Sequence, residues 1–103
     1  GSGGDFEVTV TGGTTPTYSW ELGPAFTLDV RRTSDVNTPV WGIQPDPAEL
    51  VNALESPVVH GVVPSGYAAA FAVETTLTAG IEYRVVVGYT AGVGSIGFTD
   101  FTP

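Results

Sequence analysis

Short runs of alternating apolar and polar residues cover most of the chain. The clearest run spans 83–89, where Tyr83, Val85, Val87 and Tyr89 share one face. A period of two is typical of β-strands that bury one side, and the Gly, Pro, Thr and Asp residues between the runs indicate turns. Predicted strands cover residues 6–11, 18–22, 26–32, 40–43, 58–63, 68–77, 83–89 and 96–101. Seven or eight short strands with regular turns favour an antiparallel β-sandwich.

One segment breaks this pattern and predicts a short helix over 47–55. Asp46 is a good N-cap, and Pro47 suits the first helical position. Leu50 and Leu54 then recur at helical spacing. We expect this helix to close one end of the sandwich core.

The stretch 68–77 allows two interpretations. Its alanines suit a helix, whereas Phe71, Val73, Thr75 and Leu77 alternate as in a strand. We favour a strand that ends near Leu77.

Charge excludes several classes of partner. The chain of 103 residues has 11 acidic residues and only three bases, Arg31, Arg32 and Arg84, which gives a net charge of -8. A nucleic-acid-binding protein needs a basic face, and an anionic membrane surface would repel this chain. No apolar run approaches the roughly 20 residues that span a bilayer. The acidic balance is typical of a soluble extracellular or periplasmic domain.

Missing residue types exclude much catalytic and cofactor chemistry. The chain has no Cys and no Lys, so it has no disulfide, thiolate nucleophile, Cys-based zinc site or Schiff-base lysine. The single histidine, His60, lies among valines, where a structural role is expected. The segment 92–97 matches the glycine fingerprint of dinucleotide-binding proteins, but a strand follows it instead of the required helix. We therefore expect no catalytic site, no cofactor and no enzymatic activity.

The segment 77–87 carries the most specific motif. Tyr83 opens the strongest strand, Gly80 suits the turn before it, and Leu77 is placed to fill the core. This segment resembles the tyrosine corner of fibronectin type III and related immunoglobulin-like sandwiches, in which the Tyr hydroxyl bonds back to the chain upstream. Trp20 resembles the core Trp of the second strand in that family. The predicted helix is not a family feature.

The resemblance implies an immunoglobulin-like, fibronectin type III-like sandwich of about seven strands. It covers most of 6–101, while residues 1–4 are expected to be a linker or tag-like tail and 5–103 the single domain. The chain also resembles domains of bacterial surface lipoproteins. That likeness implies an extracellular or cell-surface location after removal of a leader.

Candidate ligand-binding residues are few. Trp41, Tyr67 and Tyr89 would form an aromatic platform for a sugar if they were exposed together. Asp35 with Asn37, or Asp46 with Glu49, supply oxygen atoms, but neither set approaches the six or more oxygens that Ca²⁺ prefers. Turn formation and helix capping explain these side chains, so no metal site is predicted.

Three functions remain open at the level of sequence. The first is a non-catalytic surface module that acts as a spacer or as an adhesion or binding domain, with a protein or glycan partner. The second is a self-assembling subunit of an extracellular filament, in which the run 6–10 adds to a neighbour's sheet. The third is a carbohydrate-binding module.

Overall fold

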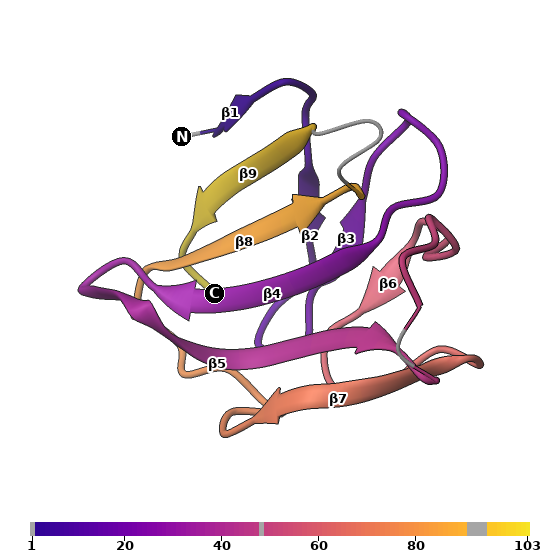
Figure 1. The fold of residues 1–103 in the computed structure, drawn as a ribbon. Helices are drawn as coiled ribbons and strands as arrows, with labels where there is room; N and C mark the ends of the chain where they lie inside the picture. The colour runs from indigo at the N-terminus through magenta and orange to yellow at the C-terminus, as the bar shows by residue number, and fades with distance from the viewer. Residues whose placement is uncertain (1, 48, 91–94) are drawn as a thin grey trace.

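Two antiparallel sheets pack together in the computed structural model, which describes residues 2–47, 49–90 and 95–103 (Figure 1). The larger sheet has the order β1-β9-β8-β4-β5-β7, and the smaller has the order β2-β3-β6. The strands are β1 (Ser2–Gly4), β2 (Thr9–Thr11), β3 (Thr17–Ser19), β4 (Thr27–Arg32), β5 (Asp35–Pro45), β6 (Val58–Val59), β7 (Tyr67–Ala72), β8 (Tyr83–Gly88) and β9 (Ile96–Phe101). The prediction of an all-β, two-layer fold is confirmed.

The core lies between the sheets, where strand alternation delivers apolar side chains. On β8, Tyr83, Val85 and Val87 are buried, while Arg84 and Val86 point to the outer face. Core side chains from both sheets complete the layer. They are Val8, Tyr18, Trp20, Ala25, Leu28, Val30, Val40, Trp41, Ile43, Leu54, Val58, Leu77, Tyr83, Val85 and Val87.

The predicted helix over 47–55 is wrong. No described residue of this segment is helical, and Leu50, expected on the buried face, is 81% exposed. Leu54 is buried instead by an isolated β-bridge, in which it exchanges two backbone hydrogen bonds of 2.8 Å with Ala25. A two-turn helix has little intrinsic stability, so these tertiary contacts outweigh the capping signal at Asp46.

Several strands differ in length from the alternating runs. β3 and β6 are shorter than predicted, because the chain turns after Ser19 and again at Gly61, whose φ is +86°. β7 ends at Ala72 rather than near Leu77, whereas β5 is much longer than 40–43. The alternating runs extend beyond these strands because residues just outside a strand still face either the core or solvent. The apolar and polar pattern therefore does not mark where the strand ends.

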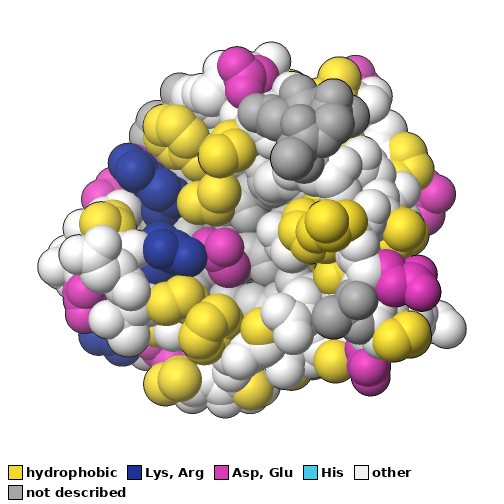
Figure 2. All heavy atoms as spheres, in the orientation of Figure 1, with side chains coloured by type: hydrophobic (Ala, Val, Ile, Leu, Met, Phe, Trp, Pro, Cys, Tyr) yellow, Lys and Arg dark blue, Asp and Glu magenta, His cyan; other side chains and the backbone are white. Residues whose placement is uncertain are grey.

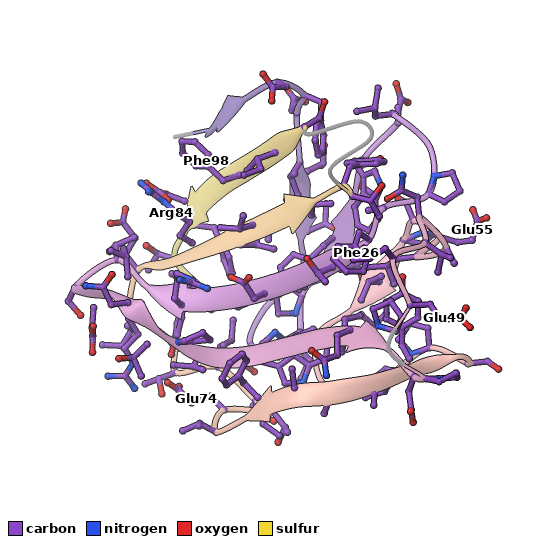
Figure 3. All side chains as sticks on the ribbon, in the orientation of Figure 1. Phe26, Glu49, Glu55, Glu74, Arg84 and Phe98 are labelled. Carbon is purple, nitrogen blue, oxygen red and sulfur yellow. The ribbon has the colours of Figure 1, made fainter. Side chains whose placement is uncertain are left out.

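Residues Ser2–Gly4, expected as linker, form the edge strand β1 against β9. Gly3 pairs with Phe98, and a Cβ atom on Gly3 would lie only 2.7 Å from Phe98 Cζ. The Arg84 guanidinium lies 4.5 Å from the centre of the Phe98 ring, and both side chains project from the same face (Figure 3). The missing glycine side chain therefore lets an aromatic ring cover the start of the chain.

Tyr83 forms the corner that leads into β8. Its hydroxyl accepts a hydrogen bond of 2.9 Å from the backbone N–H of Thr78 and donates one of 2.8 Å to Glu74 Oε1. Gly80 takes a φ of +86° in the intervening turn, and Leu77 is buried. These contacts satisfy the hydroxyl of a fully buried ring.

None of the described residues belongs to a helix with the length and apolar composition that a bilayer crossing requires.

Candidate binding groove

An open groove of about 620 Å³ lies beside the smaller sheet. Its walls come from residues 5–8, which connect β1 of the larger sheet to β2 of the smaller sheet, and from β2 and β3. The turn after β3 and the segment before β6 complete them. The lining residues are Phe6, Glu7, Thr9, Ser19, Trp20, Glu21, Leu22 and Ser56. Its volume falls within the range of small-molecule and peptide side-chain sites.

The groove has a rigid aromatic floor. The Trp20 indole N–H donates to the Gly23 carbonyl at 2.9 Å, and its backbone N–H donates to Ser56 Oγ at 3.0 Å. The ring of Phe6 meets that of Tyr89 edge to face, with centroids 5.4 Å apart. Both aromatic residues are therefore held in place before any ligand arrives, which lowers the entropic cost of binding.

The groove carries negative charge that no neighbouring base neutralises. Glu7 and Glu21 are exposed at its rim, and the described lining residues include no Arg. All three bases lie instead on strands of the larger sheet. They form ion pairs between Arg31 and Asp29, Arg32 and Glu74, and Arg84 and Asp100. The groove thus presents a negative potential to solvent.

Two of these ion pairs, Arg31 with Asp29 and Arg84 with Asp100, lie on the outer face of the larger sheet, whereas the Arg32 guanidinium lies over the ring of the buried Tyr83. Figure 2 looks onto this face and shows the basic side chains gathered on its left half, beside hydrophobic ones. Hydrogen bonding to Arg84 lowers the pKa of Asp100, and the same contact raises the pKa of Arg84. The arginines are thus engaged within the chain, so the net charge of -8 comes from acids elsewhere.

His60 occupies a buried structural position. Its Nε2 lies 2.7 Å from the Glu74 carbonyl oxygen, which can only accept, so Nε2 carries the proton. Nδ1 then accepts a hydrogen bond of 2.8 Å from the Tyr18 hydroxyl. Burial lowers the pKa of His60, while the contact with Glu74 opposes this shift. The imidazole is neutral at pH 7, and both nitrogens are occupied.

The three aromatic residues expected to form a sugar platform do not come together. Trp41 is only 1% exposed and packs in the core, with its ring 4.6 Å from that of His60. The Tyr67 hydroxyl donates to the Phe26 carbonyl at 2.8 Å, and the Tyr89 hydroxyl donates to that of Gly23. Alternation of apolar and polar residues did not reveal that Trp41 is buried, because β5 is buried on both faces near this residue.

The other candidate sites give little support for ligand binding. Asp35 and Asn37 lie on β5, while Asp46 and Glu49 are exposed beyond its end. Over the described ranges, no group of three or more His, Cys, Asp or Glu side chains is placed to hold a metal ion. Half of the glycine motif at 92–97, residues 92–94, lies outside the described residues.

Sequence reasoning missed Glu74, which joins four parts of the fold. Its carboxylate accepts from Tyr83 and from Arg32 Nε, the latter at 3.0 Å, and its backbone carbonyl accepts from His60. Its backbone N–H donates to the Val40 carbonyl at 2.8 Å. A single glutamate after an apolar run carries no signal of such a role, because its partners come from distant segments.

A second feature that sequence reasoning missed is a hollow of about 110 Å³ on the outer face of the larger sheet. It forms because Gly42 has no side chain between Asp29 and Phe71. Burial raises the pKa of Asp29, although the charge of Arg31 opposes this shift.

Comparison with known proteins assigns no family. No family model, no curated protein and no solved structure matches this chain significantly. The geometry of the groove is therefore the basis for any functional conclusion.

Proposed function

We propose that this chain is a non-catalytic binding module of a cell-surface or secreted protein, and that the groove beside Trp20 holds its ligand. The observation that carries the proposal is the combination of a pre-organised aromatic floor with two unneutralised carboxylates. A positively charged segment of a partner protein fits this chemistry best. Glu7 and Glu21 would pair with Lys or Arg side chains, and the aromatic rings would contact their aliphatic stems.

Two observations support a role without catalysis. General acid or base work needs a titratable group within reach of substrate. His60, the only histidine, is buried, neutral and hydrogen-bonded at both nitrogens, so it serves the core. The carboxylates of Asp29, Glu74 and Asp100 are engaged by arginines.

The corner at Tyr83 supports kinship with fibronectin type III modules, because its hydroxyl binds the chain a few residues upstream. One departure from the immunoglobulin-like pattern concerns the strand before the corner. In that pattern the preceding strand belongs to the opposite sheet. Here β7 and β8 both belong to the larger sheet. The likeness therefore supports a sandwich architecture and transfers no ligand.

The alternative functions find less support. A filament built by donating 6–10 requires a free segment, yet Val8 is buried and Phe6 packs against Gly97. A sugar platform built on Trp41 requires an exposed ring, and that ring lies in the core.

Trp20 provides the signal that tests the proposal. We expect a lysine-rich peptide to change tryptophan fluorescence, because Trp20 lines the groove while Trp41 is shielded in the core. Replacing both Glu7→Gln and Glu21→Gln should weaken binding by about tenfold or more. The matched control, Asp46→Asn with Glu49→Gln, removes two exposed carboxylates outside the groove.

Equal weakening in both double variants would show that the peptide responds only to net charge, and the groove assignment would be wrong. A neutral oligosaccharide that binds in place of the peptide, with the same sensitivity to Glu7 and Glu21, would redirect the proposal to a carbohydrate-binding module.

A further inference from the structure

One side of the sandwich is built from an uncharged stretch. The eighteen residues between Glu55 and Glu74 contain no Asp, Glu, Lys or Arg, in a chain with a net charge of -8. They form β6 and β7, which are edge strands of the smaller and larger sheets. Figure 3 labels Glu55 and Glu74, the two acids that bound this stretch. We call this side the neutral edge.

The neutral edge exposes an unusual share of apolar side chains. Ten large hydrophobic side chains are exposed among the described residues, and five of them belong to this stretch. These five are Val59, Val62, Val63, Phe71 and Val73. Val73 is 75% exposed and Phe71 is 46% exposed. Concentrated apolar exposure of this kind marks interaction surfaces on soluble proteins.

The two edge strands form one continuous side. His60 Nε2 donates to the Glu74 carbonyl, and a Cβ atom on Gly61 would lie 2.6 Å from the Thr75 carbonyl oxygen. The turn after β6 therefore lies against the segment after β7. Figure 1 shows β6 and β7 on the side of the molecule away from β1 and β9.

The backbone of β7 has a free edge. Among the described strands β7 pairs with β5 alone, so its N–H and C=O groups that point away from β5 have no partner in any of those strands. Proteins usually protect such edges with charges or proline, and Tyr67–Ala72 has neither. The one protective device is a bulge at Ala70, which adds local twist. Association at this edge would thus rest on apolar packing as well as on backbone pairing.

We propose that two copies of this chain associate through their neutral edges, with the β7 strands antiparallel across a two-fold axis. Charge favours a second copy as the occupant, because two chains with a net charge of -8 repel each other wherever acids face one another, and residues 56–73 contribute no acid to the contact. A two-fold axis makes one surface serve both partners and closes the assembly at a dimer.

The register of β7 fits this arrangement. Phe71 pairs with Gly42 and Ala68 with Gln44, which places both on the outer face of the larger sheet. With the axis between Ala69 and Ala70, each Phe71 ring would lie opposite Ala68 of the second copy. A small residue opposite a ring leaves room for it to pack.

The size of the neutral edge also fits a dimer. A standard interface takes about 800 Å² from each partner. The whole chain exposes 5215 Å², and the stretch holds about a sixth of its residues. Among the described lining residues of the groove, only Ser56 also belongs to the neutral edge, and Glu7, Glu21 and the aromatic floor lie outside that edge, so either proposal can fail without the other.

Sedimentation velocity across a wide range of protein concentration tests the dimer. We expect a reversible monomer–dimer equilibrium that strengthens with salt, because salt screens the repulsion between two acidic chains. Phe71→Lys and Val73→Lys should each raise the dissociation constant at least about tenfold. Both side chains are exposed, so circular dichroism and thermal melting should match the parent.

Ile96→Lys is the matched control, since Ile96 is 51% exposed on β9, outside the neutral edge. All three lysines reduce the net negative charge equally, so a dimer governed by charge alone would strengthen in every variant. The proposal requires that only the two edge variants become monomeric. A monomeric parent at every concentration and salt, a dimer that survives both edge lysines, or open-ended polymers would each overturn it.

Discussion

The two lateral sides of the sandwich are closed by different means. Beside β1, β2 and β9, the chain itself crosses from one sheet to the other, and Phe6 lies where a Cβ atom on Gly97 would be 2.7 Å from both its ring and its carbonyl oxygen. The Thr99 hydroxyl also donates to the Val8 carbonyl. At the neutral edge, side-chain hydrogen bonds join the sheets, because His60 connects Tyr18 to the backbone of Glu74.

This difference shows how the same architecture can depend on shape at one side and on polar contacts at the other. Close packing is disrupted, and stability is lost, when a substitution makes a side chain too large or too small. A polar contact fails when a donor is removed or a proton is added. The first side should therefore respond to residue size, and the second to hydroxyl deletion and pH.

The largest effect is expected from the removal of Trp20, a core residue on the side of the sandwich that holds Phe6. Trp20→Ala should lower the free energy of unfolding by about 3–5 kcal/mol, through lost burial and the cavity left behind. Equilibrium denaturation in urea measures this change. Leu22→Ala, at a half-exposed neighbour, should cost far less, and equal costs would place Trp20 outside the core.

The next effect tests the close contact between Phe6 and Gly97. Gly97→Ala should cost about 1–3 kcal/mol, because part of the contact is with backbone and cannot yield like a flexible side chain. Gly88→Ala is the matched control in the neighbouring strand. Its new methyl group would meet Thr27 Oγ1 at an ordinary 3.6 Å, so it should be neutral or slightly stabilising. Similar losses at both positions would remove the steric account.

A smaller effect is expected at the corner. Tyr83→Phe should cost about 1 kcal/mol or somewhat more, because the Thr78 N–H and the Glu74 carboxylate both lose a partner. Thermal melting and urea denaturation report the change. A variant that unfolds like the parent would mean that the hydroxyl contributes nothing to the corner.

The smallest effect is a pH dependence from His60. Its pKa is lower in the folded chain than the ordinary 6.5, so the unfolded chain binds more protons as pH falls through 6.5. Stability is fully present above that value and decreases below it. Between pH 7 and 6 the loss should reach at most about 0.7 kcal/mol. His60→Gln should flatten this part of the urea stability profile, and an unchanged slope would exclude His60 as its source.

The elements that sequence predicted well share one property. In 26–32 and 83–89, alternation coincides with a strand whose one face is the core, so the periodic pattern and the fold agree. The prediction of a helix over 47–55 was wrong because a two-turn helix has little intrinsic stability, while the burial of Leu54 depends on a bridge to Ala25, almost thirty residues earlier. Trp41 is unsuited to a sugar platform because it pairs with Val30 on the core face of the larger sheet and is buried there.

The residues of the candidate groove also separate into those that the sequence made recognisable and those that it did not. Trp20 is recognisable from its strand-like neighbourhood, but nothing in the sequence brings Phe6, Glu21 and Ser56 to the same surface. Glu74 has no distinguishing context, and its role comes from Arg32, Tyr83 and His60, which arrive from three other segments.

By itself, the sequence determined that this protein is a small, acidic, all-β domain, because composition and a period of two are local properties. Tertiary structure decided which sheet edge is left without a strand partner, that Glu7 and Glu21 line the same groove, and which acids pair with the three arginines. Those outcomes depend on contacts between residues distant in the chain, and the order of the strands brings such residues together.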